Sequence, residues 1–236
     1  LAKSGTAAAK LLLRSGISVR VNDKNSSDQD AAVIQLQEKG AEVITGSHPV
    51  SVLEQIDLIV KNPGIAYEHP LLKLAVKREI PIITEVELAY YLAKDHQVIG
   101  ISGSNGKTTT TMLTYEMLKE SKLPIKLAGN IGIVATEVAQ ALEEGDQLLL
   151  ELSSFQLLGT EKFRPKVACL LNLYDAHLDY HHTVEAYEEA KSYLFARQGE
   201  DDILIYNFDN EKVVNLIEDA EARRVPFSRT KRLDEV

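Results

Sequence analysis

The sequence is poor in cysteine and has no long apolar run, and both features exclude classes of protein. Cys169 is the single cysteine among 236 residues, so the chain cannot form an internal disulfide, which fits a reducing compartment. No apolar run approaches the roughly 20 residues that cross a bilayer. The first residues do not show the basic and apolar segments of a signal peptide. We therefore expect a cytoplasmic protein without a membrane partner.

Runs of basic residues are scarce as well. No stretch of lysine and arginine is longer than two residues, and the formal net charge is −9. Non-specific binding to a nucleic acid backbone requires a basic surface, so we do not expect a nucleic acid partner. A helix N-terminus with one lysine can still bind the phosphate of a small molecule.

Short β-branched segments alternate with helical patterns, which predicts parallel sheets covered by helices. The expected strands of the first half are Val19–Asn22, Glu42–Thr45, Leu58–Val60 and Ile82–Thr84. Its expected helices lie near Ala2–Arg14, Asp28–Lys39, Pro70–Arg78 and Glu85–Leu92. The expected strands of the second half are Val98–Ile101, Gln147–Leu152, Val167–Leu173, Ile203–Tyr206 and Val225–Ser228. Ala93–Gln97 is expected to join two domains, 1–93 and 94–236.

The most specific motif is the segment Gly100-Ile-Ser-Gly-Ser-Asn-Gly-Lys-Thr108. It stands between an expected strand and the expected helix Thr108–Ser121, whose apolar stripe we assign to Leu113, Met117 and Leu118. In this context backbone N–H groups and the positive end of the helix surround phosphates.

Within this segment, Lys107 is expected to reach the β- and γ-phosphates of a nucleotide, and the Thr108 hydroxyl to bind Mg²⁺. Five residues separate Gly100 from Gly106, one more than in the usual pattern, and Gly103 is the additional glycine. The flanking strand and helix favour a phosphate loop over an ordinary turn, so we predict ATP binding.

Three further polar residues occupy positions suited to such a site. Glu151 ends a buried strand, where either a Mg²⁺ ligand or a solvated acid is found. His177 follows the strand Val167–Leu173 after a short turn, and a lone histidine is usually structural. Lys191 shares the inward face of the expected helix Val184–Arg197, and spacing alone favours snorkelling along the apolar surface.

Together these segments resemble the Mur ligases. The matching segments are Gly-Ile-Ser-Gly-Ser-Asn-Gly-Lys-Thr-Thr-Thr (100–110), Gly-Asn-Ile-Gly (129–132), Glu-Leu-Ser-Ser-Phe-Gln-Leu (151–157), Ala-His-Leu-Asp-Tyr-His (176–181), Asn-Pro-Gly-Ile (62–65) and Thr-Glu-Val-Glu-Leu (84–88). The resemblance covers essentially the whole chain. The segment 151–157 points to the member of the family that adds D-glutamate.

The resemblance implies an α/β protein with a Rossmann-like domain that binds the UDP group, followed by a P-loop NTPase-like domain with a mostly parallel sheet. It also implies ATP-dependent addition of D-glutamate to UDP-N-acetylmuramoyl-L-alanine, a cytoplasmic step of peptidoglycan and cell wall synthesis. In this family the substrate carboxylate attacks the γ-phosphate, and the amine of the amino acid then attacks the acyl phosphate. We expect a monomer.

The resemblance also assigns roles to individual residues. Nucleotide contacts are expected at Gly103, Ser104, Asn105, Gly106, Lys107, Thr108 and Thr109. Contacts to the UDP substrate are expected at Lys3, Ser4, Asp23, Asn62, Gly64, Asn130 and Ser153. The expected catalytic residues are Lys107, His177 and Lys191. Thr108 and Glu151 are expected to bind one Mg²⁺, and His177 is expected to bind a second. A carbamylated Lys191 is expected to support the second ion. This role requires Lys191 to face inward, so the resemblance reverses the snorkelling interpretation.

Family members begin with a strand and a glycine-rich turn before Leu1, and they continue past Val236 into a third domain that contacts D-glutamate. We therefore expect this chain to be a fragment with little or no ligase activity by itself. Phosphate release from ATP that depends on D-glutamate, measured on the 236-residue chain, would contradict this expectation.

Three alternatives stay open. A folylpolyglutamate-type ligase shares the phosphate loop, and product formation with folate instead of the UDP substrate would distinguish it. A dinucleotide-binding dehydrogenase is disfavoured because no complete Gly-x-Gly-x-x-Gly follows a strand. A nucleotide-binding module without turnover would not require Glu151, His177 and Lys191.

Overall fold

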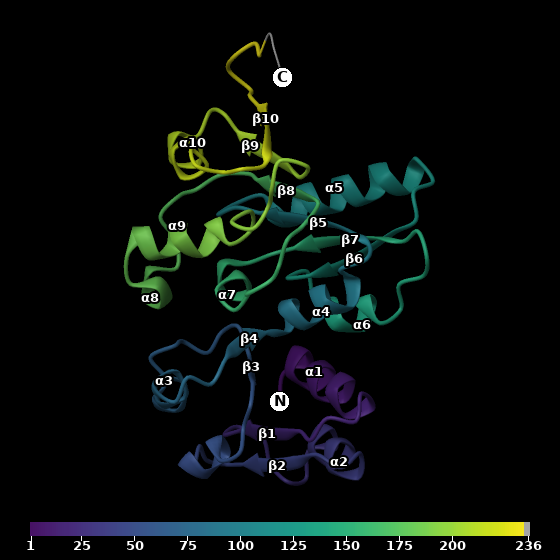
Figure 1. Cartoon of the computed structure of the whole chain (residues 1–236), viewed down its shortest axis with the longest axis vertical. Coiled ribbons are helices and arrows are strands. Elements are labelled where there is room, and N and C mark those ends of the chain that lie inside the picture. Colours follow the sequence, from purple (N-terminus) through teal and green to yellow (C-terminus); the bar gives the residue numbers. More distant parts are fainter. Residues whose placement is uncertain (234–236) are drawn as a thin grey trace.

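A six-stranded parallel sheet forms the centre of the second half of the chain (Figure 1). The computed structural model describes residues 1–233, so residues 234–236 of the expected second domain lie outside it. In spatial order the strands are β10 (Arg223–Phe227), β9 (Ile203–Asn207), β8 (Val167–Leu170), β5 (Gln97–Ser102), β7 (Gln147–Glu151) and β6 (Ile125–Gly129). Each neighbouring pair is parallel, as the alternation of strands and helices predicts.

The central strands of this sheet are buried on both faces. On β7, Leu148 and Leu150 pack into the main core with α4 (Glu85–Ala93) and α6 (Ala135–Ala139). Leu149 packs on the other face, near Tyr115 of α5 (Lys107–Glu120). Because successive side chains of a strand point to opposite faces, α5 covers the face opposite α4 and α6.

The remaining helices of this half follow the strands in the chain. They are α7 (Ser154–Leu157), α8 (Leu178–His181), α9 (Val184–Ser192) and α10 (Glu211–Leu216). Tyr187 of α9 and Val213 of α10 are buried in the same core as α4. Helices α9 and α10 therefore cover the α4 face of the sheet.

The first half contains two separate pairs of parallel strands. In the first pair β1 (Arg20–Asp23) lies beside β2 (Glu42–Thr45), and in the second β3 (Ile59–Lys61) lies beside β4 (Ile82–Thr84). Helices α1 (Lys3–Arg14), α2 (Ala31–Glu38) and α3 (Pro70–Lys77) and the 3-10 helix η1 (Val50–Leu53) complete this half. Within residues 1–233 no strand joins the two pairs into the single sheet of a doubly wound domain.

Most expected elements are present within a few residues of their expected bounds. The expected helix Val184–Arg197 is shorter, ending at Ser192, and β6 is absent from the sequence-based prediction. The apolar stripe expected on α5 is wrong at Leu113 and Met117, which are 59% and 63% exposed, and is confirmed at Leu118. Among residues 1–233, no helix combines the length and apolar character that crossing a membrane requires.

The face that α5 turns to the sheet carries Leu118 of the expected stripe together with two residues that were not assigned to it. Thr111 is fully buried, and Tyr115 and Leu118 pack against the cluster that contains Leu149. These three residues are spaced by four and three positions, which places them on one side of the helix. The helical period was therefore correct, whereas the face that it buries depends on how the helix docks.

Helix α4 packs with the second half, although the expected boundary follows it. Val86, Ala89 and Ala93 are completely buried in the core of the six-stranded sheet. The chain crosses between the halves at Thr84, whose hydroxyl donates to the carbonyl oxygen of Gln156 at 2.7 Å. On this packing we propose a boundary near Thr84 instead of Ala93.

Candidate functional site

The phosphate loop lies at the carboxyl edge of the sheet, between β5 and α5. Strand β5 ends at Ser102, residues 103–106 form a turn, and Lys107 begins the helix. Gly106 has a φ of 78°, a conformation that glycine adopts without the steric cost of a Cβ. The expected nucleotide residues 103–109 therefore lie together at the N-terminus of a helix, where backbone N–H groups attract phosphate.

The additional glycine of the loop is explained by a close approach of the chain after β8. A Cβ on Gly103 would lie 3.0 Å from Leu171 Cβ and 3.3 Å from the backbone nitrogen of Asn172. Asn172 is bonded to the loop, because its carbonyl oxygen accepts from Ser104 N at 2.9 Å and its Oδ1 accepts from Asn105 N at 2.8 Å. A side chain at position 103 would disturb this contact.

Two expected catalytic lysines meet at the phosphate loop. Lys107 Nζ donates to the carbonyl oxygens of Gly103 and Ser104 at 2.9 and 3.0 Å. Lys191 Nζ, from α9, donates to Ser102 Oγ at 2.9 Å and to the carbonyl oxygen of Gly103 at 3.0 Å. Lys191 is 1% exposed, so it points inward and the snorkelling interpretation is wrong.

Burial affects the pKa of both lysines. Burial, with the neighbouring charge of Lys107, lowers the pKa of Lys191 to about 7. Burial also lowers the pKa of Lys107, and the charge of Glu151 opposes that shift. Burial therefore favours the uncharged amine of Lys191, which is the nucleophilic form.

Glu151 ends β7 in register with Ile101 of β5, beside the phosphate loop. It is 1% exposed, and its Oε1 accepts a hydrogen bond from Asn130 Nδ2 at 2.9 Å. Its Oε2 is buried and has no hydrogen-bond partner in the described chain. Because an unpaired buried carboxylate oxygen is costly, this residue fits a cation ligand.

His177 is the N-cap residue of α8, in the chain that follows β8. Its φ of 56° is uncommon for a residue other than glycine, and its ring contacts Phe155 at a centroid distance of 4.9 Å. Its side chain is exposed and therefore accessible. Within residues 1–233, no three His, Cys, Asp or Glu side chains gather as a metal site. A cation here would also require hydroxyl or phosphate oxygens.

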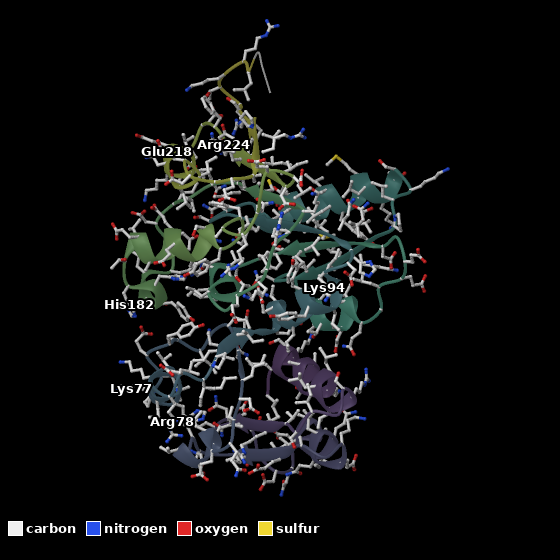
Figure 2. The ribbon with its side chains drawn as sticks, viewed as in Figure 1. Lys77, Arg78, Lys94, His182, Glu218 and Arg224 are labelled. Carbon is white, nitrogen blue, oxygen red and sulfur yellow. The ribbon has the colours of Figure 1, made fainter. Side chains whose placement is uncertain are left out.

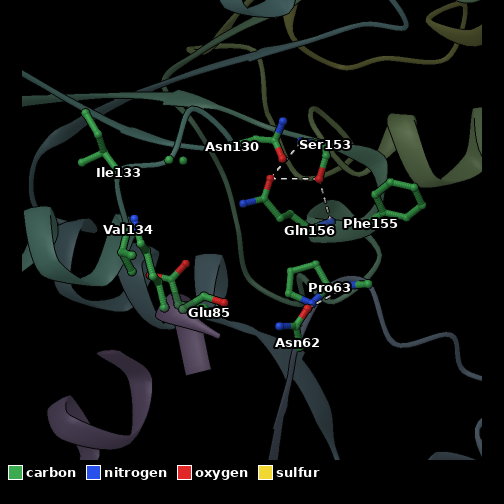
Figure 3. A pocket seen from close by; sticks show the side chains of 14 residues that line it. Asn62, Pro63, Glu85, Asn130, Ile133, Val134, Ser153, Phe155 and Gln156 are labelled. Atoms are coloured by element: carbon green, nitrogen blue, oxygen red, sulfur yellow. Dashed lines mark hydrogen bonds between the residues drawn. The ribbon is translucent and has the colours of Figure 1, made fainter. Parts of the chain in front are cut away.

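A cleft of about 350 Å³ opens between the two halves of the chain beside this edge (Figure 3). Figure 3 shows Asn130 and Ser153 on one side and Asn62 on the other. The cleft is lined by six of the expected substrate residues: Lys3, Ser4, Asn62, Gly64, Asn130 and Ser153. The structure thus brings together residues from α1, the loop after β3, the turn after β6 and the N-cap of α7.

Asp23 is the expected substrate residue that does not line the cleft. It is the last residue of β1. Its Oδ1 accepts from the backbone nitrogens of Asn25 and Ser26. Asp23 therefore stays outside the set of residues that line the cleft.

Sequence reasoning missed several residues of the cleft, including Glu85, Phe155 and Gln156. Gln156 accepts from the backbone nitrogen of Ser153 at 3.0 Å, and Ser153 Oγ accepts from Gln156 N at 3.3 Å, which forms a capping box. The Ser-x-x-Gln spacing in the sequence could have predicted this capping box, and with it the position of Gln156. Glu85 accepts from Thr136 N at 2.5 Å, a contact between distant segments that no local pattern predicts.

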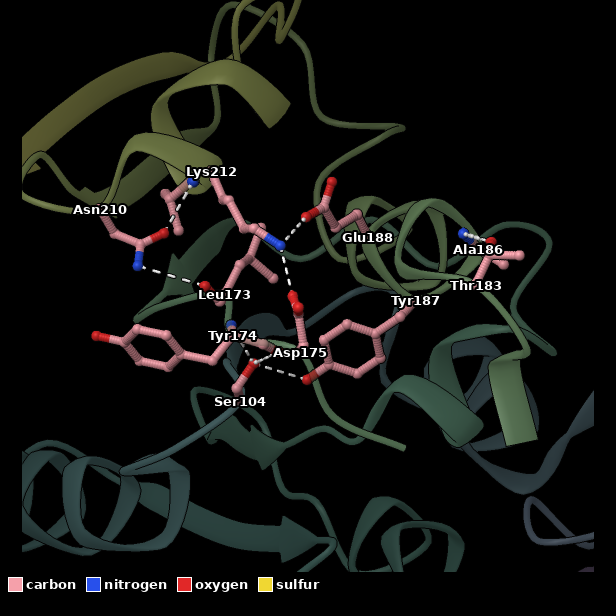
Figure 4. A network of polar contacts seen from close by, with 11 residues as sticks. Ser104, Leu173, Tyr174, Asp175, Thr183, Ala186, Tyr187, Glu188, Asn210 and Lys212 are labelled. Carbon is pink, nitrogen blue, oxygen red and sulfur yellow. Dashed lines mark hydrogen bonds and ion pairs between the residues drawn. The ribbon is translucent and has the colours of Figure 1, made fainter. Parts of the chain in front are cut away.

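A polar network connects the phosphate loop to α9 (Figure 4). Ser104 Oγ lies 2.9 Å from the Tyr187 hydroxyl and accepts from Tyr174 N at 2.9 Å. Farther out, Lys212 Nζ pairs with Asp175 at 2.6 Å and with Glu188 at 3.2 Å. Because α9 also carries Lys191, this network fixes the helix and the loop relative to each other.

Comparison with known proteins agrees with this arrangement. Residues 101–235 match the Mur ligase middle domain, and residues 1–84 match the Mur ligase MurD-like N-terminal domain. The chain is 53% identical over 233 residues to the UDP-N-acetylmuramoylalanine–D-glutamate ligase of Oceanobacillus iheyensis, covering 99% of this chain and 52% of that protein. It is 51% identical over 237 residues to the enzyme of that name from Bacillus subtilis, covering 100% of this chain and 52% of that protein. The chain thus spans about half the length of the curated relatives that it matches.

Solved structures share the fold at lower identity. The UDP-N-acetylmuramate:L-alanyl-gamma-D-glutamyl-meso-diaminopimelate ligase of Neisseria meningitides superposes with a TM-score of 0.61 at 18% identity, covering 95% of this chain and 74% of that chain. MurF ligase of Thermotoga maritima, in complex with ADP, superposes with a TM-score of 0.54 at 20% identity, covering 90% of this chain and 49% of that chain. The domain matches, which cover most of the sequence, show that the chain belongs to the Mur ligase family.

Proposed function

We propose that the protein containing this chain is an ATP-dependent ligase that joins D-glutamate to UDP-N-acetylmuramoyl-L-alanine in peptidoglycan synthesis. The observation that carries the proposal is the hydrogen bond from Asn130 Nδ2 to Glu151 Oε1, at 2.9 Å. It joins a residue of the cleft to the acid beside the phosphate loop. A carboxylate held in the cleft would therefore lie near a nucleotide bound at the loop.

The relatives support this assignment. The curated relatives that match nearly the whole chain at 50–53% identity carry the name UDP-N-acetylmuramoylalanine–D-glutamate ligase. The Thermotoga maritima MurF structure, which shares this fold, is a complex with ADP. We propose ATP as the nucleotide and residues 103–109 as its contacts.

In the proposed reaction an oxygen of the L-alanine carboxylate attacks the γ-phosphorus, and the bond to ADP breaks. The D-glutamate amine then attacks the acyl carbon, loses a proton, and inorganic phosphate leaves. Lys107, at the N-terminus of α5, would attract the transferring phosphate. Asn130 and Ser153 would orient the substrate that carries the carboxylate.

We propose Mg²⁺ as the metal cofactor. Thr108 and Glu151 would hold one ion, and His177 a second with Lys191 as its carbamate, formed when the uncharged amine binds carbon dioxide and releases a proton. When bound, Mg²⁺ would neutralise negative charge on the phosphates. The unpartnered Oε2 of Glu151 supports a cation at that position.

The test is a coupled assay on the full-length gene product. We expect phosphate release only when ATP, UDP-N-acetylmuramoyl-L-alanine and D-glutamate are all present, with the ligated product identified by mass. Turnover with a folate substrate in place of the UDP substrate would favour the other ligase type. Nucleotide binding without any turnover would contradict the proposed function.

A further inference from the structure

Lys61 is a buried cation at the border between the two halves. It is the last residue of β3, is 3% exposed, and is held by backbone carbonyls instead of a carboxylate. Its Nζ donates to the carbonyl oxygens of Pro63 and Ile65 at 3.2 and 3.0 Å and to the Tyr180 hydroxyl at 3.3 Å. These three acceptors match the three hydrogens of the ammonium group.

Tyr180 reaches this position from α8 in the other half. Its hydroxyl oxygen lies 3.0 Å from the carbonyl oxygen of Pro63 and 3.1 Å from that of Ile65, so it donates its one hydrogen to this loop. The Lys61 ammonium also lies 4.9 Å from the centre of the Tyr67 ring and 6.0 Å from the centre of the Tyr180 ring. The aromatic rings favour a cation at this border.

Both ends of this contact adjoin the cleft. The loop after Lys61 contributes Asn62 and Gly64 to the cleft lining, and Phe155 contributes from the opposite side. The Phe155 ring contacts Tyr180 at a centroid distance of 4.6 Å and His177 at 4.9 Å. The Lys61–Tyr180 contact therefore joins the two walls of the cleft next to His177.

Lys61 itself does not line the cleft, and its three hydrogens are already used within the protein. Direct binding of a substrate anion by this ammonium group would break these bonds. The hydrogen bonds of Lys61 are instead suited to holding loop 62–65 in place.

We infer that Lys61 is a positioning residue for the UDP-linked substrate, because with Tyr180 it holds loop 62–65 against α8 and so fixes the width of the cleft. This inference rests on the proposed function of the cleft. The phosphate loop is not part of the contact, so nucleotide binding should be independent of it.

The kinetic test uses the full-length gene product and the variants Lys61→Met and Tyr180→Phe. Lys61→Met should raise KM for the UDP substrate by about tenfold or more, since a hydrogen bond to a charged group has about this strength. KM for ATP should stay within about twofold. Tyr180→Phe keeps the ring against Phe155 and should shift KM in the same direction by a smaller factor.

The matched control is Glu68→Gln. Glu68 pairs with His182 at 3.3 Å between the same two segments, but both side chains are more than half exposed, and His182 is labelled at the side of the molecule in Figure 2. An exposed ion pair of this kind contributes little to the stability of the fold. Glu68→Gln should therefore leave both KM values unchanged. Equal changes of both KM values in Lys61→Met, or no change in either variant, would overturn the inference.

A second readout does not depend on activity. Amide hydrogen exchange of Gly64 and Ile65 should be about tenfold faster or more in Lys61→Met and faster in Tyr180→Phe, while the amides of α5 keep their rates. If the wild-type protein shows no ligase activity, the proposed function fails, and exchange still decides whether Lys61 holds the loop. Unchanged exchange in both variants would show that it does not.

Discussion

Lys191 Nζ donates a hydrogen bond to Ser102 Oγ across 2.9 Å, which joins α9 to the strand that leads into the phosphate loop. Both side chains are buried. A buried lysine without a carboxylate at contact distance is costly when charged, and an uncharged amine or a carbamate avoids this cost. The contact places this side chain where either form would influence a nucleotide bound at the phosphate loop.

Replacing Lys191 by alanine tests the carbamate. We expect Lys191→Ala to bind ATP with unchanged affinity and to lose turnover in the full-length enzyme. Added acetate should restore part of the turnover, because a small carboxylate can occupy the space that the carbamate would fill. Turnover equal to that of the wild type would contradict a carbamate at this position.

Replacing Lys107 by methionine removes the cation of the phosphate loop. We expect ATP affinity to fall about 100-fold, since hydrogen bonds between charged groups are the stronger ones. Isothermal titration calorimetry on the 236-residue chain provides the measurement. Lys94→Met, which alters an exposed lysine after α4, is the control and should bind ATP like the wild type.

Glu151→Gln tests the metal ligand. The substitution keeps an oxygen to accept from Asn130 Nδ2 and removes the negative charge from the unpartnered oxygen. We expect Mg²⁺ to strengthen nucleotide binding by the wild type and not by the variant, with an unfolding free energy at least as high. Equal enhancement by Mg²⁺ in both proteins would exclude Glu151 as a ligand.

Gly129→Ala tests a close approach that places Asn130. Gly129 has a φ of 105°, and an added Cβ would collide with the carbonyl oxygen of Glu151. We expect a loss of about 3 kcal/mol or more in unfolding free energy, measured by urea denaturation. Gly145→Ala has a similar φ of 88° with open space around the Cβ, so it should cost only about 1 kcal/mol. Equal losses of unfolding free energy in the two variants would show that the chain around position 129 shifts to relieve the collision with Glu151.

Lys61 should make stability depend on pH. Burial lowers its pKa from 10.5 to about 8, so below pH 8 the ammonium is charged in both the folded and unfolded chains. Between pH 8 and 10.5 the unfolded chain holds more protons, and the contribution of Lys61 to the unfolding free energy therefore rises with pH. Relative to Lys61→Met, the wild type should gain on the order of 2 kcal/mol from pH 7 to pH 10. Urea denaturation at both pH values measures this difference, and a gain of zero or less would contradict the burial of a charged Lys61.

Local patterns predicted the phosphate loop and the parallel sheet of the second half. A glycine-rich turn before Gly-Lys-Thr and continuously apolar strands depend on neighbours in the sequence, so they are visible without a structure. The inward orientation of Lys191 followed from the resemblance, whereas the helical period alone left snorkelling open. Two of the three residues assigned to the buried face of α5 were incorrect, because Leu113 and Met117 are apolar yet exposed to solvent.

The sequence by itself determined the alternation of strands and helices, the anion-binding turn and the family of the chain, because these depend on residue type and spacing. Only the tertiary structure decided that α4 belongs to the second core, that Asp23 does not line the cleft, and that Lys61 meets Tyr180. These features join segments as far apart as 119 positions. Their geometry depends on which faces of distant elements pack together, and spacing along one segment does not encode that choice.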